Sequence, residues 1–274
     1  MKRIMTIQDI SCVGKCSLTV ASPIISSAGV ECAVLPTAVL STHTAFDKFT
    51  FCDLTDEISP IKDTLIDLGI DFDAVYTGYL GSFRQLELVE DFISSFNGKA
   101  IIDPVMADNG KLYKGFTPEF AKRMAELCSR ADLIIPNLTE ASFMLGIPYN
   151  PEYNEEYIRN VLKSLTDLGA KTAALTGIGF KEDEIGVYAY DSESDEYYYY
   201  FNEKLPCAFH GTGDIYASAT VGALMRGFTT FESLRIAVDF TLQCMKCTMN
   251  DPAHRFYGVN FEKAIPYYIS LLSK

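Results

Sequence analysis

Short apolar runs alternate with longer amphipathic segments along most of the chain. The apolar runs predict buried strands, and the amphipathic segments, which follow a helical period, predict helices. The expected strands are Lys2–Ile7, Cys32–Thr37, Ala74–Thr77, Ala100–Ile102, Ala131–Ile135 and Thr172–Thr176. The expected helices are Leu18–Ala28, Thr55–Leu68, Leu86–Phe96, Pro118–Ser129, Pro136–Leu145, Asn154–Leu168, Ile215–Met225, Phe231–Cys247 and Phe261–Leu272. This alternation predicts an α/β fold of the doubly wound type, with a mostly parallel central sheet flanked by helices.

Three segments depart from the regular alternation. Gln8–Ser17 is polar and contains a glycine, which predicts a turn after the first strand, and Val39–Phe51 predicts an irregular, lid-like segment. Glu184–Tyr190 and Glu196–Phe201 predict an antiparallel hairpin, a small addition to the parallel sheet. Because no repeat or compositional break interrupts the chain, we expect residues 1–274 to form a single domain.

The composition indicates a globular protein with an acidic surface. Of the 274 residues, 48% are hydrophobic, enough for a sizeable core, and the formal net charge is −13. This charge, together with the lack of a Lys/Arg cluster, argues against nucleic acid or an anionic membrane as a partner. An anionic small-molecule substrate therefore needs local positive potential from backbone amides or from a metal.

The cellular setting is predicted from the start of the chain and from its cysteines. Met1–Ile10 lacks the apolar core of a signal peptide, and no apolar run reaches the length of a membrane span, so we expect a cytoplasmic protein. The eight cysteines are scattered through apolar surroundings and are expected to be reduced. Cys244 and Cys247 fall in a predicted helix, which favours two packed thiols over a metal or redox pair.

The turn Gly211-Thr212-Gly213-Asp214 opens a predicted helix rich in small residues. Thr212 is expected to be the N-cap, and the two glycines allow backbone amides at the helix start to approach an anion closely. The carboxylate of Asp214 is unusual at such a place. It can act as a partner of the helix dipole, hold a metal, or take a proton from an attacking hydroxyl. Seen alone, an ordinary acidic helix start explains the turn equally well.

Other polar residues follow the predicted strands. Because the carboxyl ends of parallel strands meet at one edge of a sheet, these residues are expected to share a cleft there. They are Thr44, Tyr79, Asp103, Asp108, Asn137, Thr176 and the turn at Gly211–Asp214. Each also has a structural interpretation: Asn137 with Glu140 resembles a capping box, and His43 suits a structural donor. Together they have the parts for moving a phosphoryl group to an alcohol, with Asp214 as the base.

The ordered set of motifs resembles the ribokinase-like superfamily of ATP-dependent kinases. The residues that carry this resemblance are Gly211-Thr212-Gly213-Asp214, Asp103-Pro104-Val105 with Asp108, and Pro136-Asn137 with Glu140. The narrower resemblance is to the pyridoxal kinase branch, through Ile7-Gln8, Ser41 with His43-Thr44, and Thr77-Gly78-Tyr79. It implies ATP-dependent phosphorylation of the 5′-hydroxymethyl group of a vitamin B6 vitamer, either pyridoxal, pyridoxamine or pyridoxine.

The resemblance also implies roles for individual residues. Asp214 is the expected catalytic base, and Gly211, Thr212 and Gly213 form the anion hole over the transferring phosphate. The expected nucleotide site comprises Asp103, Asp108, Asn137, Glu140 and Thr176, with Mg²⁺ held at Asp108 and Glu140. The expected vitamer site comprises Asp9, Ser11, His43, Thr44 and Tyr79. A homodimer, a mobile segment over the nucleotide at Asn109–Phe116 and adenine near Leu242–Met249 complete these expectations, and a monovalent cation is left open as a further cofactor.

One departure from the family pattern and two rival functions remain. Asp9 stands where members of the branch usually have serine, and its carboxylate can accept a hydrogen bond from a phenol or pair with an amine, so we expect a preference for pyridoxamine. A hydroxymethylpyrimidine kinase of thiamine synthesis is the nearest alternative, because its acceptor is also a hydroxymethyl heteroaromatic ring. The second alternative is a sensor that binds vitamer or nucleotide without turnover.

Overall fold

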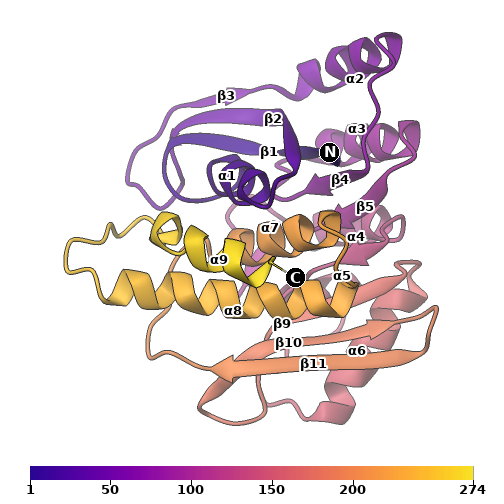
Figure 1. Ribbon diagram of the computed structural model, residues 1–274. Coiled ribbons are helices and arrows are strands. Elements are labelled where there is room, and N and C mark those ends of the chain that lie inside the picture. The colour runs from indigo at the N-terminus through magenta and orange to yellow at the C-terminus, as the bar shows by residue number, and fades with distance from the viewer. Residues whose placement is uncertain (274) are drawn as a thin grey trace.

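The computed structural model describes residues 1–273 and is built around a sheet of nine strands. The strand order across the sheet is β11-β10-β9-β8-β5-β4-β1-β2-β3, so β11 and β3 form its two edges (Figure 1). The strands are β1 (Arg3–Val13), β2 (Glu31–Thr42), β3 (Phe51–Asp53), β4 (Ala74–Thr77), β5 (Lys99–Ile102), β8 (Leu133–Ile134), β9 (Thr172–Ile178), β10 (Glu184–Asp191) and β11 (Glu196–Glu203). The predicted α/β fold is confirmed.

The centre of the sheet is parallel and its edges are antiparallel. All pairs from β2 through β1, β4, β5 and β8 to β9 are parallel. The hairpin of β10 and β11 adds antiparallel strands beyond β9, as the sequence predicts, and β3 pairs antiparallel with β2. From β1 the chain crosses to β2 on one side and later returns to β4 on the other. Such a reversal of strand order opens a crevice at the carboxyl end of the strand where it occurs.

Helices cover both faces of the sheet and bury a separate apolar core on each (Figure 1). One face carries α1 (Leu18–Ser27), α7 (Thr212–Met225), α8 (Thr230–Met249), the short 3₁₀ turn η2 (Phe261–Lys263) and α9 (Ile265–Leu271). The other face carries η1 (Thr55–Glu57), α2 (Ile58–Asp67), α3 (Phe83–Ser95), α4 (Pro118–Cys128), α5 (Leu138–Leu145) and α6 (Glu155–Asp167). Within residues 1–273 no helix has both the length and the apolar character needed to cross a bilayer.

The structure corrects two predicted boundaries near the start of the chain. β1 continues to Val13, so most of the expected turn at Gln8–Ser17 is strand, and β2 continues to Thr42. The polar side chains misled the prediction, because hydrogen bonding along β2 supports β1 as far as the pair of Val13 with Thr42. Asp9 and Ser11 therefore lie on a strand rather than in a loop.

A second sheet, of two strands, was not predicted from the sequence. β6 (Ala107–Asp108) and β7 (Lys111–Leu112) form a short antiparallel hairpin after β5. Its turn contains Asn109 and Gly110, both with positive φ (50° and 75°), which is the geometry of a tight hairpin turn. This hairpin, called the β6–β7 hairpin below, lies within the segment expected to cover the nucleotide.

Candidate active site

The carboxyl half of β1 brings an acid into the crevice. The register of β1 with β2 shifts between Gln8 and Ile10, so that Asp9 alone lies opposite Thr37 and Ala38. Irregularities of this kind redirect a side chain and are common beside active sites. The Asp9 side chain is only 7% exposed, and its Oδ1 accepts a 2.6 Å hydrogen bond from the hydroxyl of Ser17.

Ser17 reaches Asp9 through an unusual backbone conformation. Its φ is 48° and its ψ is −133°, values that a non-glycine residue rarely adopts. Strain of this kind persists where the surrounding contacts enforce it, and it is concentrated at functional sites. The backbone amide of Ser17 also donates to the carboxylate of Asp214. Ser17 therefore joins two carboxylates that the sequence assigned to different roles.

The predicted vitamer residues gather around Asp9. Burial, and to a smaller extent the charge of Asp9, raises the pKa of the Tyr79 phenol, and His43 lies close enough to lower the pKa of Asp9. Burial is the largest influence on Asp9 and raises the pKa of its carboxyl. Ser11 is buried on β1, and its hydroxyl contacts the Cys16 thiol at 3.9 Å. Thr44, in contrast, is exposed next to His43.

The backbone engages both ring nitrogens of His43. Its Nδ1 accepts a hydrogen bond from the amide of Ala45 at 3.0 Å, so its Nε2 carries the hydrogen and donates to the carbonyl of Tyr257 at 2.9 Å. The ring also packs against Phe46 and lies 6.2 Å from the His210 ring, measured between centroids. His43 is thus a satisfied structural side chain that can offer a ring face, but no free nitrogen, to a ligand.

The helix start that the sequence assigns to the anion hole, called the cradle below, is that of α7. Gly211 is its N-cap with φ 82°, and a Cβ there would lie 2.2 Å from the backbone oxygen of Lys15. No side chain caps the first turn, so its amides remain available for a ligand. The sequence predicted Thr212 as the N-cap, and this prediction is wrong, because Thr212 is the first helical residue. Its hydroxyl donates to the carbonyl of Phe209 at 3.4 Å. A space beside Gly213 is open.

Asp214 stands at the mouth of this cradle. Burial raises the pKa of its carboxyl to about 7, the amide of Ser17 opposes that rise, and the charge of Asp9 adds to it. The charge of Asp214 in turn raises the pKa of Asp103, so Asp9, Asp103 and Asp214 share one electrostatic environment. A carboxylate with a pKa near neutrality can accept a proton in water at physiological pH.

A second pair of acids consists of Asp103, which follows β5, and Glu140 in the first turn of α5. Asn137 and Glu140 form a reciprocal capping box, in which the Asn137 side chain accepts from the Glu140 amide and Glu140 accepts from the Asn137 amide, each at 2.9 Å. Glu140 is 3% exposed and Asp103 is 6% exposed. Burial raises the pKa of Glu140 to about 8, and burial together with Glu140 raises that of Asp103 well above its usual range. The structural and functional interpretations of Glu140 are compatible.

The β6–β7 hairpin is fastened to the same helix start. Glu140 Oε1 accepts from the amide of Met106 at 3.1 Å, the Asn137 side chain donates to the carbonyl of Ala107 at 2.8 Å, and Thr139 Oγ1 accepts from the amide of Gly110 at 3.0 Å. These bonds fix the base and the turn of the hairpin. Asp108 is exposed on it and accepts from both nitrogens of Asn109.

Two further predicted residues complete this edge of the sheet. Thr176 of β9 forms an isolated bridge with Asn137, and its amide donates to the carbonyl of Pro136 at 3.0 Å. Phe116, beyond the hairpin, packs its ring against that of Tyr79 with centroids 5.5 Å apart. The segment expected to cover the nucleotide therefore contacts the expected vitamer side of the cleft.

Several site residues were missed by the sequence analysis. Ser17 is one, although a serine immediately before a helix is a recognisable capping signal. Tyr76 of β4 is another: it is fully buried, and Asp103 and Asp214 both raise the pKa of its phenol, which burial raises most. Beneath the two acids lie four fully buried side-chain atoms without a partner, Gln8 Oε1, Tyr76 Oη, Thr77 Oγ1 and Ser218 Oγ. No sequence pattern marks an apolar strand tyrosine as part of a site.

Within residues 1–273 the acids of the cleft raise one another's pKa values and have no Lys or Arg side chain paired with them. Among residues 1–273, no Lys or Arg forms an ion pair with Asp9, Asp103, Asp108, Glu140 or Asp214. Nor do three metal-binding side chains converge anywhere in that part of the chain. One or two carboxylates with phosphate oxygens and waters are the usual ligands of Mg²⁺ in nucleotide sites. Asp103 and Asp108, whose charges both interact with Glu140, offer the one or two carboxylates that such a nucleotide-borne Mg²⁺ needs.

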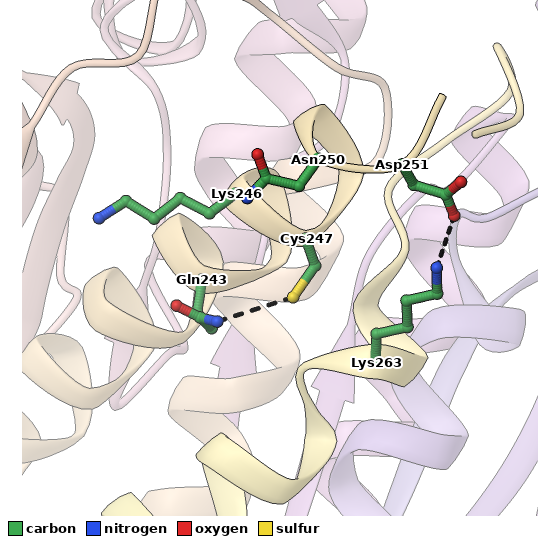
Figure 2. A pocket seen from close by; sticks show the side chains of 6 residues that line it. All are labelled: Gln243, Lys246, Cys247, Asn250, Asp251 and Lys263. Atoms are coloured by element: carbon green, nitrogen blue, oxygen red, sulfur yellow. Dashed lines mark hydrogen bonds and ion pairs between the residues drawn. The ribbon is translucent and has the colours of Figure 1, made fainter. Parts of the chain in front are cut away.

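A cavity of about 310 Å³ lies at the carboxyl end of α8 (Figure 2). It is lined by Gln243, Lys246, Cys247, Asn250, Asp251 and Lys263. It coincides with the stretch where adenine was expected, although Lys263 and Asp251 pair across it at 2.6 Å. Lys15, whose backbone oxygen lies against Gly211, reaches toward this cavity by contacting Asn260, which donates to Asp251.

An anion cradle with a carboxylate at its mouth, on the carboxyl edge of a parallel sheet, defines a phosphotransferase of the ribokinase-like class. The sequence profile of the phosphomethylpyrimidine kinases matches residues 26–257. The chain belongs to this family. Pyridoxine kinase from Bacillus subtilis is 30% identical over 77% of this chain and 76% of its own length.

Solved structures agree with this assignment. A candidate phosphomethylpyrimidine kinase from Bacteroides thetaiotaomicron, in a crystal form with pyridoxal, is 38% identical and superposes with a TM-score of 0.92 over 97% of this chain and 95% of its own. Pyridoxal kinase from Lactobacillus plantarum is 27% identical, with a TM-score of 0.92 over 99% of this chain and 98% of its own. The resemblance stated from the sequence is confirmed.

Proposed function

We propose that the protein transfers the γ-phosphoryl group of ATP to the 5′-hydroxymethyl group of a vitamin B6 vitamer. The observation that carries the proposal is the position of Asp214 at the uncapped start of α7. An acid there repels a phosphate that merely binds, whereas it serves a reaction in which an alcohol loses its proton beside the phosphate. The proposal is supported by the pyridoxal in the Bacteroides relative and by the activity named for the Bacillus relative.

In the proposed reaction Asp214 accepts the proton of the vitamer hydroxyl as its oxygen attacks phosphorus. The amides of Gly211, Thr212 and Gly213 hold the oxygens of the transferring group, on which negative charge is concentrated. The field of α7, whose amino-terminal end points at the phosphate, adds to this stabilisation. Most of the catalysis then comes from positioning and charge neutralisation.

The nucleotide side is proposed at the other half of the cleft. Asp103, Asp108 and Glu140 would hold Mg²⁺ together with the nucleotide phosphates, and Asn137 and Thr176 would line the phosphate path. The metal supplies neutralisation of charge between the phosphates. The hydrogen bond from the Met106 amide to Glu140 holds the base of the β6–β7 hairpin beside the proposed metal region. We assign the adenosine end to the surface of α8 near the cavity of Figure 2.

The vitamer side is proposed around Asp9. Ser11 and Tyr79 border the ring, the face of His43 packs against it, and Thr44 closes the outer rim. Water is excluded by Phe116 and Tyr79, whose rings meet above this part of the cleft. Excluding water matters because water competes with the vitamer as phosphoryl acceptor. The cytoplasmic location and the homodimer stay predictions.

Hydroxymethylpyrimidine is the second candidate acceptor, because the family profile is named for a kinase of phosphomethylpyrimidine, which has the same ring. Release of ADP, measured with pyridoxal, pyridoxamine, pyridoxine and hydroxymethylpyrimidine as acceptors, separates the two. Turnover of a B6 vitamer supports the proposal. A strong preference for the pyrimidine replaces it with the alternative, and binding of vitamers without turnover favours a sensor.

A further inference from the structure

Asp9 is a buried carboxylate without a counter-ion. Its side chain is 7% exposed, and within residues 1–273 no Lys or Arg pairs with it. The one side chain that donates to it is the neutral hydroxyl of Ser17. The titratable groups that face it are Cys16, His43, Tyr79 and Asp214. Both ring nitrogens of His43 are bound by backbone groups, so the ring has no nitrogen left to pair with Asp9.

Holding an acid here is costly for the fold. Burying an unpaired carboxylate is unfavourable, and the repulsion between Asp9 and Asp214 adds to that cost. The strained φ of 48° at Ser17 and the register shift in β1 are further costs of aiming the side chain into the cleft. A site built in this way suits a ligand that brings a donor with positive charge.

We infer that Asp9 accepts a hydrogen bond from the protonated ring nitrogen of the acceptor and thereby selects rings that are cationic at that atom. The inference rests on the proposed function. All three vitamers carry a basic ring nitrogen, whereas the ionised phenolate of the ring would repel Asp9. The amine occurs in pyridoxamine alone. A carboxylate is also the group that pyridoxal phosphate enzymes use toward this nitrogen.

The arrangement of the two acids agrees with the shape of the ring. One ring carbon separates the nitrogen from the carbon that bears the 5′-hydroxymethyl group, so both groups lie on the same side of the ring. Asp9 and Asp214 are near enough for their charges to interact, and Ser17 bonds to both. One acid can therefore contact the nitrogen while the other contacts the hydroxyl.

The test uses 5-deoxypyridoxal, which lacks the hydroxyl that is phosphorylated, so binding is separated from turnover. Its ring absorbs differently when the nitrogen is protonated, and the absorption of the bound ligand is followed against pH. Affinity is also measured for the benzene analogue, in which C–H replaces the ring nitrogen. Both ligands are titrated into the wild type, Asp9→Asn and the control Asp47→Asn, an exposed acid of the β2–β3 turn.

The wild type and Asp47→Asn are expected to hold the ring protonated to a higher pH than free ligand, and to bind it about 10-fold or more tightly than the benzene analogue. Asp9→Asn should bind 5-deoxypyridoxal and the benzene analogue with similar affinity. The ring bound to this variant should lose its proton at the same pH as the free ligand. Equal affinity of the wild type for the two ligands overturns the inference, even where Asp9→Asn does not fold. Phosphorylation of pyridoxal by the same wild-type preparation reports separately on the proposed function.

Discussion

The hydroxyl of Ser17 donates a 2.6 Å hydrogen bond to the carboxylate of Asp9. The backbone amide of the same serine donates to Asp214, so one residue positions an acid on each side of the proposed acceptor. The positive φ of Ser17 allows both donors to face the cleft. Recognition of the vitamer and activation of its hydroxyl are thereby coupled through a residue that need not touch the substrate.

Ser17→Ala removes the hydroxyl and keeps the amide. We expect KM for the vitamer to rise about 10-fold, because a hydrogen bond to a carboxylate contributes about 1.5–3 kcal/mol, while kcat changes little. The matched control is Ser27→Ala at the other end of α1, where the hydroxyl donates to the carbonyl of Ile24. Steady-state kinetics of both variants measure the effect. A fall in kcat alone would place Ser17 on the chemical step instead.

Asp214→Asn tests the proposed base. The amide keeps the shape of the side chain but cannot accept the proton, so kcat should fall by about 10² or more. Nucleotide affinity should stay nearly the same, because the amides of the cradle are unchanged. Single-turnover rates and nucleotide titrations measure the two quantities. If neither the wild type nor Asp214→Asn phosphorylates any of the vitamers, the result supports the sensor interpretation.

The pH dependence follows from the raised pKa of Asp214. A base acts when it is deprotonated, so kcat/KM should rise tenfold per unit of pH below about 7 and level off above it. Because the charge of Asp9 contributes to the raised pKa, Asp9→Asn should move the inflection to lower pH, and Asp47→Asn should leave it in place. An inflection that stays fixed in Asp9→Asn contradicts the electrostatic coupling of the two acids.

Glu140→Gln separates capping from charge. Glutamine keeps one acceptor for the Asn137 amide of the capping box but loses the second, which binds the Met106 amide, so the melting temperature should fall by a few degrees. The affinity for Mg·ATP should fall about 10-fold through loss of a carboxylate at the metal region. Glu232→Gln, in the capping box at the start of α8, is the control. Equal KM values for Mg·ATP in the two variants would show that the role of Glu140 is structural alone.

Much of the fold could be predicted, because it depends on local patterns. The apolar strands and amphipathic helices follow from periodicity, and the edge of the sheet that carries Asp103, Asn137 and Asp214 follows from their places after strands. The extension of β1 to Val13 could not be predicted in this way, since it depends on pairing with β2. That residues 1–274 form one domain stays a prediction.

The sequence predicted many residues of the site but not the hydrogen bonds that connect them. Glu140 was expected to have either a capping or a metal role, and the structure shows that its two oxygens bind the α5 start and the β6–β7 hairpin. Ser17 was missed because its contribution depends on a rare φ, which no residue type other than glycine signals. His43 was assigned to the vitamer site, yet only three-dimensional contacts reveal that backbone occupies both of its nitrogens.

The most direct test of the account is the steady-state phosphorylation of pyridoxal by the wild-type protein with Mg·ATP, run beside hydroxymethylpyrimidine. The account predicts formation of the 5′-phosphate with kcat/KM of about 10⁴ M⁻¹s⁻¹ or more, and a lower value for the pyrimidine. Turnover of the pyrimidine alone, or of neither acceptor, would contradict the proposed function while leaving the family assignment intact.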